Sequence, residues 1–265
     1  LADFYEAGGT SFSARELFPN LWAMSMNTEE SLKEYLSLQL KIPLVARIGP
    51  IARTFDFIAN AAPGVKEILT VGKLAYEVRE QNYDLVVVDS VASGHIVGQL
   101  TAAQGINELV HVGMVRHQTQ WMSDILNDPA QTGVVIVSAP EEMPVAETIE
   151  LAGRLKDETE VDLAAIVVNR VLPELFTERE EPLFEALRGR GPVAVLNDRL
   201  NGDVTPILDA AELAVTLRRS RAEHLSTLRA AVDPALPLIF IPYLFTRTHG
   251  ARATRRVAEL LGDEL

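Results

Sequence analysis

The chain has 265 residues, of which 48% are hydrophobic and 23% are charged, and its formal net charge at pH 7 is −13. This composition is typical of a globular protein, and the acidic charge argues against sequence-independent binding to nucleic acid, which needs a basic excess to displace counterions. The absence of cysteine excludes disulfides, thiolate metal sites and thiol nucleophiles. No apolar run is long enough to span a bilayer and no signal peptide is recognisable, so a cytoplasmic protein is expected.

The first part of the chain predicts short elements. The first 20 residues mix aromatic residues with glycine and proline, which predicts a surface connection with little structure. Residues 21–26 can form a strand, and Asn27 starts a helix with an acidic first turn. Pro63-Gly64 opens another helix, which has one apolar side.

Four short apolar runs predict strands that are buried on both faces, as in a parallel sheet. These runs are residues 85–88, 133–138, 163–168 and 238–241. A shorter strand is predicted at residues 193–196, and helical stretches are predicted at 96–126, 141–155, 172–190, 206–232 and 250–261. This order predicts parallel crossovers in a single α/β domain over residues 1–265, with an open, mainly parallel sheet and helices on both faces. The polar ends of the four strands should lie along one edge, where such sheets bind ligands.

Asp89 follows the first predicted strand and is a candidate metal ligand. A carboxylate in this place can hold Mg²⁺, which prefers oxygen ligands and keeps part of its water shell. The alternative is an aspartate that caps the next turn through Ser90 or Ser93. Gly94 allows a backbone hinge that responds to a terminal phosphate, although any strand-to-helix turn can contain glycine. His95 lacks an evident partner for general-base chemistry and is read as a surface or capping residue.

Two further strand ends carry candidate ligand-binding residues. Asn169, followed by Arg170, offers a donor and an acceptor in one plane, which suits the edge of a purine base. The alternative is an asparagine tolerated in a left-handed turn. Pro242 and Tyr243 close the last predicted strand.

Other patterns favour structural roles. The aromatic and methionine positions are expected to form core, with a groove for an apolar partner as the alternative; they are Met114, Trp121, Met122 and Phe184. The arginine-bearing helix at 206–232 is expected to be a solvated face, and the spacing of His111 and His117 does not favour a metal pair. Gly72-Lys73 is the chain's one Gly-Lys pair. Leu74 follows it and no strand precedes it, so it is not a phosphate-binding loop.

Three segments carry a resemblance to a known family. The turn VVVDSVASGH ends in Gly94-His95, the strand AAIVVNR ends in Asn169-Arg170, and LPLIFIPYLF contains Pro242-Tyr243. In this order they resemble the second switch, the adenine-contacting strand and the adenine-side loop of the ArsA-like ATPases, which include the arsenite-pump and tail-anchored-protein-targeting ATPases. Leu1 to Phe4 is similar to the tail of the first switch. The single-domain actinobacterial type is the most similar, over essentially the whole chain.

The resemblance implies a P-loop NTPase-like, three-layer fold and an ATPase that uses ATP and Mg²⁺ to switch a dimer between states. Asp89 would contact magnesium, Gly94 and His95 would face the terminal phosphate, and Asn169 and Arg170 would hold adenine with Pro242 and Tyr243. In the family a P-loop and a catalytic aspartate precede the position of Leu1, so an N-terminally truncated, inactive chain without its own catalytic residue is expected.

Other functions stay open at this point. The chain lacks the cysteines needed for arsenite or bridging zinc, and the resemblance does not extend to arsenite transport or tail-anchor capture. The alternative is a non-catalytic interaction subunit that pairs with an intact homologous ATPase. A partition-type ATPase is less favoured because no basic amphipathic terminus is present. Stable membrane insertion is not expected, whereas a transient membrane-protein partner is compatible with the family.

Overall fold

The computed structural model describes residues 8–31, 33–34, 64–90, 93–109, 114–177, 179–246 and 250–264. The chain divides into two compact units, one made of Leu1–Val135, Glu150–Ala164 and Arg247–Arg256 and the other of Ile136–Ile149, Ala165–Thr246 and Val257–Leu265. Because the division falls inside several helices and strands, the single domain over 1–265 stays a prediction.

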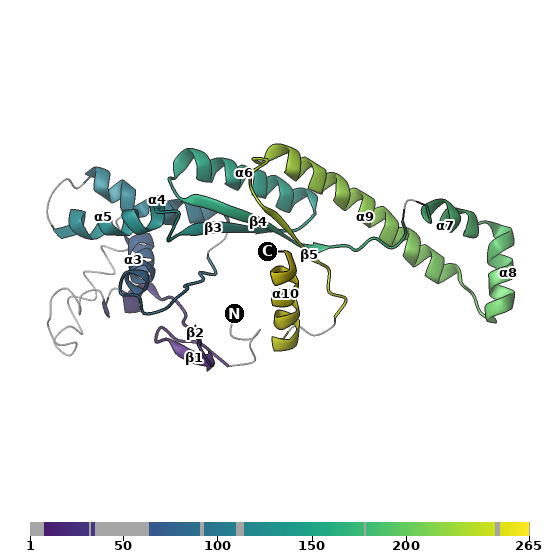
Figure 1. Cartoon of the computed structure of the whole chain (residues 1–265), viewed down its shortest axis with the longest axis horizontal. Coiled ribbons are helices and arrows are strands. Elements are labelled where there is room, and N and C mark those ends of the chain that lie inside the picture. The colour runs from purple at the N-terminus through teal and green to yellow at the C-terminus, as the bar shows by residue number, and fades with distance from the viewer. Residues whose placement is uncertain are drawn as a thin grey trace. The chain divides into compact units, whose positions relative to one another are not determined.

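Figure 1 labels the elements: β1 (Arg15–Phe18), β2 (Leu21–Ala23), α3 (Val65–Arg79), α4 (Ser93–Leu109), α5 (Met114–Asn127), β3 (Gly133–Ser138), α6 (Glu142–Glu158), β4 (Asp162–Val171), α7 (Glu181–Leu187), α8 (Arg190–Leu200), α9 (Thr205–Ala231), β5 (Leu238–Pro242) and α10 (Ala251–Glu264).

The sheet of the second unit confirms the predicted fold class. Its strand order is β3-β4-β5, and β4 pairs with β5 in parallel. The two strands bury a cluster of Ala165, Ile239 and Ile241, against which apolar side chains of α10 pack. In Figure 1, α9 lies on the other side of β4 and β5 from α10. Three of the four buried apolar runs therefore form the open α/β sheet that was expected.

The run at residues 85–88, in contrast, is not a strand of this sheet. The structure has Asp84 to Ser90 without regular secondary structure, and Leu85 and Val87 are 78% and 83% exposed. A strand exists only where a neighbour completes its hydrogen-bond ladder. Among the described residues no strand pairs with this run, so its β-forming residues stay exposed. The prediction that four strand ends share one edge is therefore wrong for this run.

Two further expectations were wrong. Residues 15–18, expected to have little structure, form β1, which pairs antiparallel with β2. Asn20 closes the tight turn between them with φ 64°, a conformation that asparagine tolerates well. Residues 193–196, expected as a strand, lie inside α8. This short apolar run had no alternation, and such runs are ambiguous between helix and strand.

The first unit packs α3, α4 and α5 around one apolar cluster, which contains Ala75, Ala103, Met122 and Ile125 with Trp121 at its border. In the second unit Phe184 is buried and stacks on Phe176, with ring centroids 4.6 Å apart. Met122 and Phe184 thus confirm the core interpretation of the aromatic and methionine positions. His111 and the side chain of Met114 lie outside the described residues.

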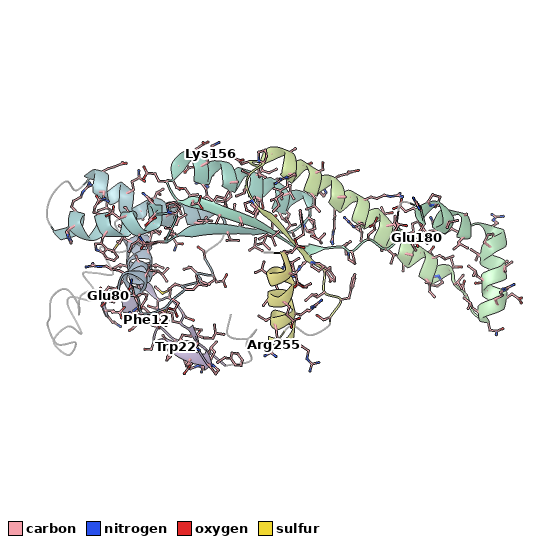
Figure 2. All side chains as sticks on the ribbon, viewed as in Figure 1. Phe12, Trp22, Glu80, Lys156, Glu180 and Arg255 are labelled. Atoms are coloured by element: carbon pink, nitrogen blue, oxygen red, sulfur yellow. The ribbon has the colours of Figure 1, made fainter. Side chains whose placement is uncertain are left out.

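A buried ionic cluster ties α3 to the helical turn that starts at Asn27. As predicted, Asn27 begins this turn, and its Oδ1 accepts the Glu30 amide at 3.1 Å. Lys73 of α3 donates to Glu34 at 2.8 Å and forms a salt bridge with Glu77 one turn further along. The lysine also lies over the ring of Phe12, which Figure 2 labels. Lys73 therefore has a structural role in the first unit.

A turn that begins at Thr177 precedes α7, and the carboxylate of Glu180 is hydrogen-bonded within this turn. Both the amide and the hydroxyl of Thr177 donate to Oε2 of Glu180 at 2.9 Å (Figure 2 labels Glu180). These hydrogen bonds, the backbone bond first, lower the pKa of Glu180. The carboxylate consequently favours the folded state only while it is ionised.

The hydrogen bonds from Thr177 to Glu180 predict an acid-dependent contribution to stability. The folded-state pKa of Glu180 lies below the ordinary value of about 4.3. Its contribution to the free energy of unfolding is therefore complete above the ordinary pKa and is lost as the pH falls through the folded-state pKa. We expect the stability difference between wild type and Glu180→Ala to be constant near neutral pH and to shrink below about pH 4. Urea unfolding over a pH series measures it. An equal pH dependence for Glu174→Ala, at an exposed carboxylate, would contradict it.

Candidate nucleotide site

The candidate site lies at the carboxyl ends of β4 and β5, where the pairing of the two strands changes register. Val168 is opposite Phe240, but Val171 is opposite Pro242, so β4 carries one extra residue at this point. A β-bulge of this kind locally interrupts the ladder and re-aims side chains. Asn169 and Arg170 are the two residues between these register positions.

The backbone of Arg170 is in the left-handed region, with φ 60°. Oδ1 of Asn169 accepts the Arg170 amide hydrogen bond at 2.8 Å, which holds this conformation. The left-handed residue of this turn is therefore Arg170 and not Asn169, and the side chain of Asn169 supports its conformation. Its Nδ2 donates to none of the described residues, and Arg170 is exposed. The asparagine amide can therefore still donate to a ligand.

Pro242 and Tyr243 border the same strand end. The Tyr243 amide donates to the Val171 carbonyl at 2.8 Å, which extends the β4–β5 pairing by one residue beyond the proline. The Tyr243 ring lies 4.9 Å from the ring of Phe245, tilted by 56°, and both rings are exposed. The structure thus brings together four predicted residues, namely Asn169, Arg170, Pro242 and Tyr243, and adds Phe245.

Sequence reasoning missed Phe245 because nothing in the pattern placed it beside Tyr243. Their i, i+2 spacing after a proline was the available signal, since an extended backbone puts such residues on one side. It also missed the anchoring of the turn after β3. Arg221 of α9 donates to Glu141 at 3.1 Å. The hydroxyl of Ser138, which is buried, accepts a hydrogen bond from the Thr148 hydroxyl at 2.8 Å. These contacts fix the end of β3.

The predicted switch residues belong to the first unit. Asp89 is exposed, and its side chain has no hydrogen-bond partner among the described residues. Ser90 donates to Gln99 of α4 at 3.3 Å, which connects the segment to that helix. Gly94 and His95 lie exposed in the first turn of α4. Residues 91 and 92 and the side chain of Ser93, which belong to the turn that Asp89 would cap, lie outside the described residues, so the capping alternative stays a prediction.

The described residues contain no cluster of three or more carboxylate, histidine or cysteine side chains that would enclose a metal. A site of Mg²⁺ type does not need such a cluster, because the ion keeps several waters and is commonly held by one or two carboxylates and substrate phosphates. Asp89, an exposed carboxylate whose side chain bonds to none of the described residues, fits this donor set. No helix in the described part of the chain is long and apolar enough to cross a membrane.

A family comparison decides the class of protein. The sequence model of the family described as "Anion-transporting ATPase" matches residues 1–117 and 105–190, which is more than half of the chain. The chain belongs to this ATPase family. The expected relation to the ArsA-like ATPases is thereby confirmed.

Individual members of the anion-transporting ATPase family align at low identity. The ATPase BagA of Mycobacterium tuberculosis is 27% identical over 157 residues, which cover 57% of this chain and 46% of BagA. An ATPase ASNA1 homolog of Plasmodium yoelii yoelii is 21% identical over 281 aligned positions, which cover 92% of this chain and 71% of that protein. The ATPase GET3 of Phaeosphaeria nodorum is 22% identical over 202 residues, which cover 62% of this chain and 61% of GET3. The chain spans about half the length of the mycobacterial relative.

Proposed function

We propose that the chain forms the adenine-binding and switch portion of an ATPase that binds and hydrolyses ATP with magnesium. The observation that carries the proposal is the strand end at β4 and β5, where the register shift places Asn169 and Arg170 beside Pro242 and Tyr243. Ligands of open parallel sheets bind outside the carboxyl ends of the strands. Family membership supports a nucleotide as this ligand.

The chemistry of the strand end suits a purine. Because Oδ1 of Asn169 is engaged by the Arg170 amide, Nδ2 is the group that would donate to a ring nitrogen of the base. The exposed rings of Tyr243 and Phe245 offer flat apolar surfaces, and stacking of a base on such a ring adds about 1–3 kcal/mol of affinity. Arg170 would contribute a positive charge near the nucleotide.

Magnesium and the phosphates would be held on the segment from Asp89 to His95. A magnesium ion bound there would neutralise phosphate charge and orient the terminal phosphate. Asp89 would contact the ion directly or through water, and Gly94 would let the backbone follow the terminal phosphate, with His95 next to it. We further propose a cytoplasmic protein that works as a homo- or heterodimer with an ArsA-like subunit and that has a transient membrane-protein partner.

A pair of substitutions at Asn169 tests the adenine site. Asn169→Ala removes both polar groups, whereas Asn169→Asp keeps the acceptor for the Arg170 amide and loses only the Nδ2 donor. We expect both variants, in the full-length polypeptide as expressed from its gene, to bind ATP with magnesium about tenfold or more weakly in calorimetry. Asn127→Ala, at an asparagine of α5 that is distant in sequence from Asn169, is the control. Wild-type affinity in Asn169→Asp would restrict this residue to supporting the turn.

A second substitution tests the magnesium site. We expect Asp89→Ala to abolish ATP hydrolysis, because removal of a metal ligand leaves the phosphate charge without its counterion. Asp84→Ala, at the other end of the same exposed segment, is the matched control and should hydrolyse ATP at the wild-type rate. Full activity of Asp89→Ala in a phosphate-release assay would refute the assignment.

The exposed apolar side chains of α7, α8 and α9 favour one alternative, a non-catalytic interaction subunit. These residues are Leu183, Leu187, Val195, Leu200, Ile207, Leu213 and Leu217. Calorimetry separates the two functions. ATP binding by the wild-type polypeptide supports the ATPase, and an absence of binding supports the interaction subunit.

A further inference from the structure

A surface pocket of about 500 Å³ lies at the turn between α9 and β5, two elements that Figure 1 labels. Arg229 of α9, residues 234–237 of the turn, and Leu238 and Phe240 of β5 border it. All of them belong to the second unit. The volume is within the range of small-molecule sites, about 300–1,000 Å³. The candidate nucleotide site lies at the carboxyl end of β5, whereas this pocket lies at its amino end, so the two are distinct.

The walls of the pocket are apolar except for the arginine. Residues 234–237 are two prolines, an alanine and a leucine. Phe240 is 37% exposed, and Leu236 and Leu238 are partly exposed. Apolar surface is therefore in contact with water here, and an apolar ligand that covers it would be stabilised by the hydrophobic effect.

The turn that forms one wall is fixed by its own hydrogen bonds. Oδ1 of Asp233 accepts the Ala235 amide hydrogen bond at 2.8 Å, and Pro234 between them has a restricted φ. The carbonyl of Pro237 accepts the amide hydrogen bond of Ile166 in β4 at 3.0 Å, which anchors the end of the turn to the sheet. A wall that is fixed before binding lowers the entropy lost when a ligand binds.

Arg229 is held against this turn by two backbone carbonyls. Its Nη1 donates to the Leu236 carbonyl at 3.2 Å and its Nη2 to the Pro234 carbonyl at 3.0 Å. A guanidinium group has five N–H donors, so these two bonds fix its orientation and leave the other donors for a ligand. The arginine is exposed, so a ligand can reach it.

The charge of Arg229 is not neutralised within the described part of the chain. Carbonyl oxygens carry no formal charge, and none of the described carboxylates forms a salt bridge with this arginine. Arg188, Arg219 and Arg221, in contrast, each pair with a glutamate. An arginine without a carboxylate partner is notable in a chain of net charge −13. Its place beside an apolar pocket favours a ligand that brings its own negative charge.

The chemistry of the pocket narrows the class of this anion. A carboxylate matches the planar guanidinium group and can accept two parallel hydrogen bonds from it. A phosphate monoester carries a charge of about −1.5 to −2, which a single arginine does not neutralise, and the acidic chain would repel it more strongly. The apolar walls require that the rest of the ligand be apolar.

We propose that this pocket binds a small organic monocarboxylate, with the carboxylate on Arg229 and an aromatic or aliphatic body against Leu236, Leu238 and Phe240. The site shares no residue with the candidate nucleotide site. Its test is made without nucleotide, and failure of the ATPase proposal would leave it unaffected.

The first experiment measures binding of 2-naphthylacetate to the chain by ligand-observed NMR titration. We expect saturable binding with a Kd on the order of 1 mM or below. The neutral 2-naphthylacetamide lacks the charge, and acetate lacks the apolar body, so each should bind at least about fivefold more weakly. No saturable binding of 2-naphthylacetate at concentrations on the order of 10 mM would overturn the proposal. Equal affinities for the acid and the amide would overturn the role of the carboxylate.

The second experiment locates the carboxylate at Arg229. In Arg229→Gln the preference for the acid over the amide should disappear, while the amide should bind as it does to wild type because the apolar walls remain. Arg255→Gln, at an exposed arginine of α10, is the matched control and should keep the preference. A preference retained in Arg229→Gln, or lost equally in Arg255→Gln, would overturn the assignment.

A third variant covers the case in which the glutamine disturbs the turn and Arg229→Gln binds neither ligand. Arg229→Lys keeps the positive charge but loses the planar fork. It should still prefer the acid over the amide, although by a smaller factor than wild type. Absence of this preference in a lysine variant that binds the amide would overturn charge recognition at residue 229. Circular dichroism checks that all three variants fold.

Discussion

Replacing Lys73 by methionine is expected to lower the free energy of unfolding of the first unit by about 3–5 kcal/mol. Glu77 is buried, and Lys73 is its cationic partner. Burial alone would lower the pKa of Lys73, but hydrogen bonds to Glu34 and Glu77 outweigh this effect and raise it. Without the lysine, Glu77 keeps a hydrogen bond from Asn82 at 2.7 Å but has no counterion. Equilibrium unfolding in urea measures the loss.

Two controls separate lost charge from lost packing. Lys66→Met changes an exposed lysine of the same helix and should alter stability by less than about 0.5 kcal/mol. Adding Glu77→Leu to Lys73→Met removes the uncompensated charge, and the double variant should recover much of the loss. A single variant as stable as wild type would show that the cluster is not a stabilising ion pair.

The second large effect is expected at Leu228, which is fully buried on α9. Leu228→Ala should destabilise the second unit by about 2–5 kcal/mol, because it removes buried methyl groups and leaves a cavity. Leu200→Ala, at an exposed leucine of α8, should cost less than about 1 kcal/mol. Thermal or urea unfolding of the three proteins makes the comparison. Equal effects of the two substitutions would contradict the burial seen for α9.

Lys73→Met and Leu228→Ala together test the prediction of one domain, because each lies in a different compact unit. In a single cooperative domain both substitutions move one common transition. If the units unfold separately, each substitution shifts only the transition of its own unit. Fluorescence reports on the first unit, since both tryptophans, Trp22 and Trp121, belong to it, and circular dichroism reports on the whole chain.

The sequence was sufficient for elements whose residues carry a clear local pattern. Unbroken apolar runs ending in polar residues predicted β3, β4 and β5. Pro63-Gly64 predicted the start of α3, and helical spacing predicted α9. Parallel strands align their carboxyl ends, so the neighbourhood of Asn169 and Pro242 followed from the strands alone.

Features that depend on a partner segment could not be predicted in this way. The run at residues 85–88 has every local property of a buried strand, but a strand is completed only by its neighbour. The hairpin β1–β2 depends on one left-handed asparagine. The pattern around Gly72-Lys73 excludes a phosphate-binding loop but does not predict the carboxylate neighbours of Lys73, because one of them, Glu34, comes from another helix. The shift of the left-handed conformation from Asn169 to Arg170 is likewise decided by pairing with β5.

The extra residue in β4 also bears on how related proteins can diverge. On either side of the bulge, residues 166–168 and Val171 of β4 are constrained by their register positions opposite β5. Asn169 and Arg170 lie between two such positions, and only the backbone of Arg170 must keep an unusual conformation. Substitution of Asn169 or Arg170 by other residues would therefore leave the packing in the interior of the sheet intact. Mutation, natural or engineered, can therefore change which ligand this strand end prefers while the fold is preserved.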